Sequence, residues 1–424
     1  MSYTTTSNLA ETGHAWIPKV PADWQLRRIK YCSPAIVEKT SDSEKHPYVG
    51  LENVEPWTGR YIAGTEEKPD AAANRFERGD VLFGKLRPYL AKVLKPDFDG
   101  RCTGELLVLR PKLYDSRYLQ YLFLSDNFIR NVDASTYGAK MPRAEWGFIG
   151  NLKSPLPPRS QQTAIADFLD RETARIDGLI AKEERLLALL EEKRTALISH
   201  AVTKGLDPDA ELKDSGIPWL GKIPKGWKVV KFKRLVRIAE GQVNPRSADF
   251  SDLQLIGPEH IEKKTGRIVQ CVTVSDVQAI SGKYFAPAGC IIYSKIRPEL
   301  RKACLVTQDS LCSADMYPLI CSSRLSKEFL LYWLLSEAFS RKMIDESMRV
   351  AMPKINREVL NNTVVPLPDK STQEKLLETL ELQLARFDTL KTKINRAIEL
   401  LREKRTALIS AAVTGKIKVE GAEG

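Results

Sequence analysis

The sequence predicts an α+β protein made of two tandem α/β domains, each followed by one long helix. The first observation behind this prediction is a repeat, since LLEEKRTALISHAVT at 189–203 returns as LLREKRTALISAAVT at 400–414, identical at 13 of 15 positions. The second is the recurrence of apolar residues at spacings of three and four before each copy, which is typical of a long amphipathic helix. The 424 residues are therefore two copies of a domain-plus-helix unit, because solenoid repeats have only roughly 20–50 residues.

The repeat extends through most of the chain. At the same offset of 211 residues, Met141 and the proline after it match Met352 and its following proline. Upstream, FGKLRPYL at 83–90 matches YSKIRPEL at 293–300 with an offset of 210, a small slip that loops of unequal length would cause.

Each globular part has the pattern of a compact α/β domain. Short runs with strand character, at 80–83 and 105–109 in the first copy, are separated by turn residues and precede a helical stretch at 117–132. A Pro-Leu-Pro segment closes the domain in both copies. The predicted boundaries are 1–158 and 206–369 for the domains, 159–205 and 370–415 for the helices, and 416–424 for a tail.

Each long helix is expected to run for about 44 residues, or about 66 Å. Gly205 and Gly415 follow the last helical residues as stops, and Ser371 with Glu374 forms a capping box at the start of the second helix. The apolar stripe along each helix must be covered. We expect the helix of the other copy to cover it; the alternative is that each helix folds onto its own domain.

The positive charge lies on the globular parts. The chain carries a net charge of +11, of which residues 1–159 hold +4 and residues 204–370 hold +7, while the two helices together hold none. An electrostatic anchor on a polyanion would therefore lie on the domains, and the helices would act as a spacer or a protein interface.

Common catalytic and metal-binding patterns are missing from the sequence. It contains no G-x-G, GxxxxGK[ST], GxSxG or HExxH, and no Asn/Asp-Pro-Pro-Tyr/Phe. The seven cysteines form no CxxC pair, and the four histidines lack metal-ligand spacing. We therefore expect a non-catalytic protein with no metal site. The absence of a signal-like N-terminus and of long apolar runs predicts a cytoplasmic protein.

Several of these features together resemble the specificity subunit of type I restriction–modification enzymes. They are the tandem α/β domains, the Pro-Leu-Pro segments, the Gln-bearing helix starts at 161–163 and 372–374, the EKRTALIS helix ends and the WLGKIP opening at 219–224. The resemblance implies that each domain is a target-recognition domain reading one half of a bipartite, asymmetric DNA site. It also implies that the two helices pair as an antiparallel coiled coil with pseudo-twofold symmetry, set the spacer between the half-sites and dock methyltransferase subunits.

The resemblance further implies partners and cofactors. The partners would be double-stranded DNA, two methyltransferase (modification) subunits and restriction/translocase subunits, with no membrane. S-adenosylmethionine, ATP and Mg would be bound by those partner subunits, and this chain would hold no cofactor. The residues themselves leave two other functions open, a DNA-modifying enzyme with an unrecognised site and a protein scaffold without a DNA role.

Basic residues kept in both copies should serve what both domains share, such as phosphate positioning, while polar residues that differ should carry sequence choice. Arg87 and Arg297 precede proline, which predicts extended backbone in a projecting loop; a surface ion pair is the alternative role. The candidates for DNA contact are Arg60, Lys85, Arg87, Tyr137, Lys140, Arg143, Arg267, Lys295, Arg297, Arg349 and Lys354.

Two further pairs of positions differ between the copies. Asn53 stands against His260, and Glu105 stands against Asp315. A carboxylate can accept from cytosine N4, so these positions are candidates for base reading. The two acids have an alternative role as buried partners of the lysines at 85 and 295.

The helix ends match almost residue for residue, which predicts a docking surface used twice, once by each modification subunit. A solvated charge pair beside the helix seam is the alternative. The candidates for partner docking are Lys193, Arg194, Leu197, Lys404, Arg405 and Leu408.

Overall fold

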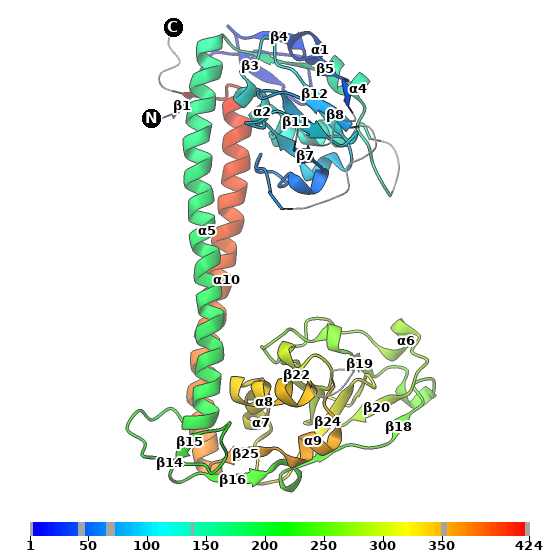
Figure 1. Cartoon of the computed structure of the whole chain (residues 1–424), viewed down its shortest axis with the longest axis vertical. Coiled ribbons are helices and arrows are strands. Elements are labelled where there is room, and N and C mark those ends of the chain that lie inside the picture. The colour runs from blue at the N-terminus through cyan, green and yellow to red at the C-terminus, as the bar shows by residue number, and fades with distance from the viewer. Residues whose placement is uncertain (1–2, 41–46, 65–72, 137–139, 349–353, 420–424) are drawn as a thin grey trace. The chain divides into compact units, whose positions relative to one another are not determined.

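The computed structural model describes residues 3–40, 47–64, 73–136, 140–348 and 354–419. The chain forms two compact units, of which unit 1 contains residues 1–184 and 395–424, and unit 2 contains residues 185–394. Each unit combines one globular domain with one half of α5 (Arg159–Lys204) and one half of α10 (Lys370–Val413) (Figure 1). The units are therefore interleaved along the chain, because each long helix starts in one unit and ends in the other.

The domain of unit 1 is built on two four-stranded sheets, with the orders β10-β9-β12-β5 and β6-β8-β11-β7. The pairing is antiparallel except between β11 and β7, which run parallel. The strands of these sheets are β5 (Ala35–Ile36), β6 (Lys39–Thr40), β7 (Tyr48–Val49), β8 (Ala73–Phe76), β9 (Val81–Gly84), β10 (Val93–Leu94), β11 (Gly100–Cys102) and β12 (Leu106–Leu109). The helices that follow them are α2 (Ser116–Phe123), α3 (Asp126–Asp133) and α4 (Trp146–Asn151).

The domain of unit 2 repeats this plan, with sheets in the orders β17-β24-β21-β22 and β18-β20-β23-β19. Its parallel pair, β19 with β23, corresponds to β7 with β11. The strands are β17 (Val236–Ile238), β18 (Gln242–Val243), β19 (Gln254–Ile256), β20 (Lys283–Ala286), β21 (Ile291–Ser294), β22 (Ala303–Leu305), β23 (Ser310–Cys312) and β24 (Met316–Cys321). The helices are α7 (Lys327–Leu335), α8 (Glu337–Ser347) and α9 (Arg357–Asn362).

Shorter strand pairs complete the units. They are β2 (Leu9–Glu11) with β3 (Lys19–Pro21), β4 (Gln25–Arg28) with β13 (Lys153–Leu156), β14 (Leu212–Asp214) with β15 (Lys222–Pro224), β16 (Lys228–Lys231) with β25 (Val364–Leu367), and β1 (Tyr3–Thr5) with β26 (Ile417–Val419). The last pair joins the two ends of the chain within unit 1, and the Pro-Leu-Pro segments lie in β13 and β25.

Aromatic side chains hold the helices of each domain against a sheet. In unit 1, every residue of β9 is buried, as expected for a strand covered on both faces. Phe83 from β9 meets the ring of Phe128 edge to face at 5.8 Å, and Phe128 stacks on Phe123 at 4.5 Å. In unit 2, Tyr293 from β21 and Trp333 from α7 both pack against Phe339 of α8. Aromatic side chains at the same positions therefore fix α3 and α8 beside their sheets.

The long helices pair antiparallel, as predicted. In unit 1, Ile176 from the first half of α5 and Leu408 from the last half of α10 lie in one core cluster, together with Tyr118 of the domain. In unit 2, Leu380 from the first half of α10 lies in one cluster with Ile198 from the last half of α5. Each half-helix therefore packs both on the other helix and on the domain of its unit. Only the first half of each helix packs on the domain that precedes it in sequence, which was the alternative arrangement.

The helix ends agree with the sequence at one terminus and not at the other. Gly205 and Gly415 follow the helices with φ of 80° and 69°, the left-handed conformation of a glycine stop. The start of α10 is capped differently from the prediction. Asp369, rather than Ser371, accepts the Thr372 amide at 2.9 Å. This hydrogen bond, together with those from the Ser371 and Thr372 hydroxyls, lowers the pKa of the Asp369 carboxyl. A carboxylate one residue before the helix also complements the helix dipole.

Candidate DNA interface and helix contacts

The strongest candidate DNA-facing element is a tight turn that occurs once in each unit. We call it the RP turn and define it as residues 85–91 in unit 1 and 295–301 in unit 2. Arg87 and Arg297 adopt the left-handed conformation, with φ of 52° and 49°, and the residue four positions later does the same in both units. The prediction of extended backbone before proline is therefore wrong. The preference of a residue before proline for extended backbone is overridden here. The Leu90 amide donates to the Arg87 carbonyl at 2.9 Å, and this hydrogen bond closes the turn.

Left-handed backbone at a non-glycine residue is strained and persists where surrounding contacts hold it. A second basic segment supplies such contacts. In unit 1, Leu86 forms an isolated β-bridge with Arg143, and the Arg87 amide donates to the Pro142 carbonyl at 2.8 Å. In unit 2, Ile296 bridges Lys354 in the same way. Basic residues far apart in the sequence are thereby brought together at corresponding places.

The side chains at this place form a cationic cluster in each unit. Arg87, Arg297 and Lys354 are exposed and have no ion pair or side-chain hydrogen bond within the described residues. Arg143 is 56% exposed and pairs with Glu105, two of its nitrogens lying 2.9 and 3.2 Å from the carboxylate. Free, exposed arginines on a fixed backbone are suited to phosphate contact.

The lysines of the RP turns are half-buried. Lys295 donates to the Ala314 carbonyl at 2.6 Å, and its ammonium lies 5.5 Å from the Tyr317 ring centroid. The alternative role of Glu105 as a partner of Lys85 does not hold, since the Glu105 side chain pairs with Arg143.

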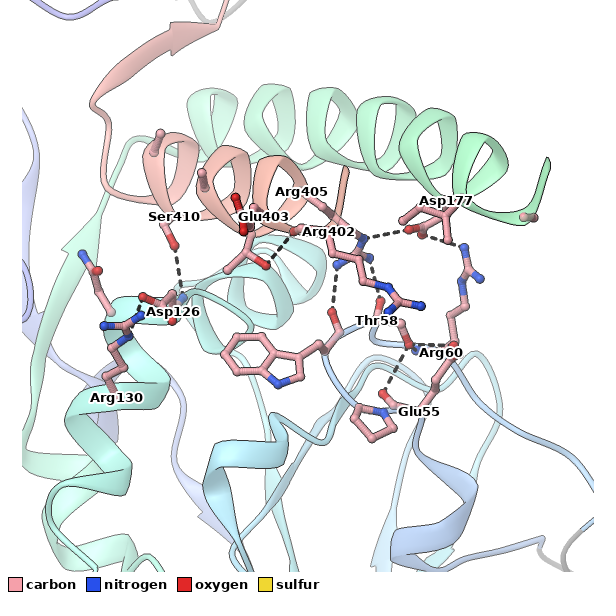
Figure 2. Close-up of a pocket in the computed structure, with 18 of the residues that line it drawn as sticks. Glu55, Thr58, Arg60, Asp126, Arg130, Asp177, Arg402, Glu403, Arg405 and Ser410 are labelled. Carbon is pink, nitrogen blue, oxygen red and sulfur yellow. Dashed lines mark hydrogen bonds and ion pairs between the residues drawn. The ribbon is translucent and has the colours of Figure 1, made fainter. Parts of the chain in front are cut away.

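Arg60 and Arg267 lie in a different place from the RP cluster, and their contact with DNA stays a prediction. Each belongs to a second repeated turn, which we call the TGR turn and define as residues 55–60 in unit 1 and 262–267 in unit 2. Arg60 pairs with Asp177 of α5 at 2.6 Å, and Arg267 pairs with Asp388 of α10. These ion pairs link each domain to a helix of its unit, and Figure 2 shows the pair of Arg60 with Asp177.

The helix-end arginine Arg405 points from α10 toward the TGR turn of unit 1, as Figure 2 shows. Its side chain is 8% exposed. Nε donates to Asp177 at 2.9 Å, and the two terminal nitrogens donate to the carbonyls of Trp57 at 2.8 Å and Thr58 at 3.1 Å. This guanidinium therefore acts inside the unit and is not available for partner docking.

Arg194 holds the corresponding place in unit 2 with fewer bonds. One terminal nitrogen donates to the Lys264 carbonyl at 3.3 Å, and Nε lies 4.0 Å from Asp388 without a hydrogen-bond partner. Burial lowers the pKa of the Arg194 guanidinium from its ordinary value. Arg194 also faces inward, so its predicted role in docking needs the same correction.

The rest of the helix-end motif is used inside the units as well. Leu408 is 7% exposed and lies in the core of unit 1, and Leu197 packs against the core of unit 2. Ser410 Oγ accepts the Asp126 amide at 3.1 Å, at the start of α3, while Ser199 does the same for α8. The near identity of the two motifs therefore corresponds to matching leucine and serine contacts inside the two units. Lys193 and Lys404 are exposed, and their docking role stays a prediction.

The remaining candidates are placed as follows. Lys140 is exposed, whereas Tyr137 and Arg349 lie outside the described residues. Asn53 and His260 are buried and accept the amides of Gly50 and Gly257, which closes the 3₁₀ turns that precede the TGR turns. These two side chains support the backbone and do not face DNA.

The sequence reasoning missed the two aspartates that receive the arginines. Asp177 and Asp388 also match at the offset of 211 residues, so the repeat contained the signal. Within the described residues, no group of three His, Cys, Asp or Glu is placed to hold a metal ion. No helix in this part of the chain is long and apolar enough to cross a membrane.

Comparison with known proteins agrees with this architecture. Residues 224–400 match the family model of the type I restriction modification DNA specificity domain. The EcoDI specificity subunit of Escherichia coli is 28% identical over 74% of this chain and 72% of its own length. The MjaVIII specificity subunit of Methanocaldococcus jannaschii is 24% identical over 95% of both chains.

Two solved structures share the fold. One, described as showing complex assembly and conformational transition of the type I R-M system, has a TM-score of 0.71 at 20% identity, covering 94% of this chain and 99% of that chain. The HsdS subunit of Thermoanaerobacter tengcongensis has a TM-score of 0.52 at 20% identity, covering 94% of this chain and 98% of its own. The predicted resemblance is thus confirmed.

Proposed function

We propose that this chain, a member of the specificity-subunit family of type I restriction–modification systems, recognises a two-part DNA site with one domain on each half. The observation that carries the division into halves is the duplicated RP turn. The same strained backbone presents an exposed, unpaired arginine in unit 1 and in unit 2. Two equivalent cationic contacts on two separately folded domains suit a duplex contacted in two places.

Phosphate contact is assigned to the residues that the two turns share. Arg87 and Arg297 are identical in type and in backbone setting, and Lys85 and Lys295 are identical in type, so they carry no information that distinguishes one half-site from the other. Base reading is left to groups that differ, such as the Glu105–Arg143 pair of unit 1. Lys140 and the residues at 137 and 349 remain candidates for the same role.

Docking of two methyltransferase subunits is proposed for outward leucines on the helices, beside Lys193 and Lys404. In unit 1, Leu179 and Leu400 are 37% and 48% exposed, and in unit 2, Leu189 and Leu390 are 40% and 46% exposed. Leu179 and Leu189 of α5 match Leu390 and Leu400 of α10 at the offset of 211 residues, so each unit presents one leucine of this matched set from each helix. Exposed apolar side chains repeated on two equivalent surfaces suit two copies of one partner.

The chain itself is proposed to be non-catalytic and cytoplasmic. Methyl transfer, ATP-driven translocation and cleavage would belong to the modification and restriction subunits, together with S-adenosylmethionine, ATP and Mg. This division is supported by the lack of catalytic motifs in the sequence.

The test is a footprint of the chain, purified with its methyltransferase subunit, on the DNA sites found by mapping methylated adenines in the host genome. We expect two protected half-sites separated by unprotected base pairs, and an affinity that falls steeply with salt. Uniform protection regardless of sequence would contradict the function. Methyl transfer by the chain alone would instead indicate an enzyme.

A further inference from the structure

We propose that Arg405 and Arg194 are positioning residues for DNA recognition, and that each acts on the domain of the other repeat. Arg405, on the helix of the second repeat, fixes the RP turn of the first domain. Arg194, on the helix of the first repeat, fixes the RP turn of the second domain. This inference rests on the proposed function, since it concerns how the DNA-facing turns are held.

The first step of the argument is the contact between helix and TGR turn. Arg405 donates to two consecutive carbonyls of that turn, those of Trp57 and Thr58. Trp57 has a φ of 64°, a conformation that costs energy for a residue with a side chain. The carbonyls of Trp57 and Thr58 can both accept from one guanidinium only while Trp57 keeps its left-handed conformation. The hydrogen bonds from Arg405 therefore stabilise that conformation.

The second step links the TGR turn to the RP turn. The Trp57 amide donates to the Ala91 carbonyl at 3.2 Å, and Ala91 is itself left-handed with a φ of 45°. The Ala91 amide closes the RP turn by donating to the Pro88 carbonyl at 2.8 Å. A continuous chain of hydrogen bonds therefore runs from Arg405 through Trp57 and Ala91 to the turn that presents Arg87.

Unit 2 contains the same chain of contacts. Arg194 donates to the carbonyl of Lys264, which has a φ of 64°. The Lys264 amide donates to the Leu300 carbonyl at 3.2 Å, next to Arg301 with its φ of 47°. The RP turn with Arg297 follows directly. A route from helix arginine through TGR turn to RP turn at two independent places argues that the link serves a shared purpose, although unit 2 makes it with fewer bonds.

Strained turns relax when a supporting contact is removed. Loss of the guanidinium leaves the TGR turn without the donors that hold its left-handed residue, and the RP turn then loses one of its anchors. The exposed arginine of that turn no longer has a fixed position, and a phosphate contact requires one. The effect should stay within one unit, because each chain of bonds lies within one unit.

The experiment uses the full chain in complex with its methyltransferase subunit, on its mapped DNA site. Arg87→Ala and Arg297→Ala first identify which half-site each domain contacts. We expect Arg405→Gln to weaken protection of the half-site that Arg87→Ala weakens, about tenfold, and to lower the log–log salt slope by about one. Arg194→Gln should weaken the other half-site and by less, since it has fewer bonds.

A double-mutant cycle separates positioning from general stability. If Arg405 acts through the RP turn, the variant with both Arg405→Gln and Arg87→Ala binds no more weakly than Arg87→Ala alone. Ser410→Ala is the matched control on the same helix, since it removes a contact with α3 and leaves both turns untouched. It should keep both half-sites.

The outcomes are distinct. A wild-type complex that protects no two-part site contradicts the proposed function itself. The positioning role alone is overturned if the wild type gives a two-part footprint but Arg405→Gln weakens both half-sites equally. It is also overturned if the loss of affinity from Arg405→Gln adds fully to the loss from Arg87→Ala. Should Arg405→Gln not fold, Arg194→Gln and Arg405→Lys decide by the same two criteria.

Discussion

The two helix-end arginines occupy corresponding places, and yet their surroundings differ. Arg405 makes three hydrogen bonds to Asp177 and the TGR turn of unit 1, all between 2.8 and 3.1 Å. Arg194 makes one, at 3.3 Å, and its buried Nε has no hydrogen-bond partner. Two motifs that are nearly identical in sequence therefore hold their domains with unequal strength.

The difference comes from neighbours that are not repeated. Ile180 of unit 1 is replaced by Lys391 in unit 2, which reaches Glu191 at 3.3 Å and Glu262 at 3.4 Å. The cavity beside the TGR turn is about 950 Å³ in unit 1 and about 140 Å³ in unit 2 (Figure 2). In unit 2, Lys391 therefore adds a bridge that unit 1 lacks, beside the arginine ion pair that both units have.

The largest expected loss of stability comes from a buried glutamine whose hydrogen bonds are the same in both units. It serves as the reference for comparing the two arginines. Gln162 and Gln373 are buried at the starts of α5 and α10, and each makes three hydrogen bonds of 2.6–3.2 Å. Replacement of either by Leu should cost about 3 kcal/mol, because three buried or part-buried backbone groups lose their partner. Their partners are Asp115, Leu113 and Pro157 in unit 1, and Ser326, Arg324 and Pro368 in unit 2.

Hydrogen–deuterium exchange measures this free energy within each unit separately, from the protection of α2 and α7. The two losses should agree within about 0.5 kcal/mol. A clear difference between them would mean that the units differ in stability generally, and the contrast between the arginines would then lose its local explanation.

The next effect tests the contrast directly. Arg405→Met should lower the free energy of local opening of the TGR turn in unit 1 by about 2 kcal/mol, since two carbonyls lose their donor. Arg194→Met should change that of unit 2 by less than about 0.5 kcal/mol, because a poorly paired buried charge is replaced by an apolar side chain of similar length. Exchange rates of the residues around Trp57 and Lys264 provide the measurement. Equal losses in both units would contradict the difference in bonding.

These arginines also show where sequence reasoning reached its limit. The repeat predicted two domain-plus-helix units and the helix pairing, because apolar periodicity and long-range identity do not depend on tertiary detail. An identical motif at two helix ends is equally expected for partner docking and for intramolecular packing, and only the contacts of Arg405 decide between them. The same holds for Arg87, whose backbone follows tertiary hydrogen bonds and not the local rule for residues before proline.

Smaller effects are expected from the serines of the same motif. Ser410→Ala and Ser199→Ala each leave the first amide of a domain helix without its acceptor, which should cost about 1 kcal/mol in either unit. Exchange of the first-turn amides of α3 and α8 reports the change. A loss confined to unit 1 would extend the inequality beyond the arginines, whereas equal losses would restrict it to them.

The smallest effect tests the origin of the inequality. Lys391→Ile gives unit 2 the residue type that unit 1 has at Ile180, and it removes two partly exposed ion pairs worth about 0.5 kcal/mol together. The free energy of opening of the TGR turn in unit 2 should fall by that amount. The revealing measurement is the same substitution made in the Arg194→Met background. If the lysine bridge shares the attachment with Arg194, the loss at Lys391 grows once the arginine is gone, and simple additivity would show that the two contacts act independently.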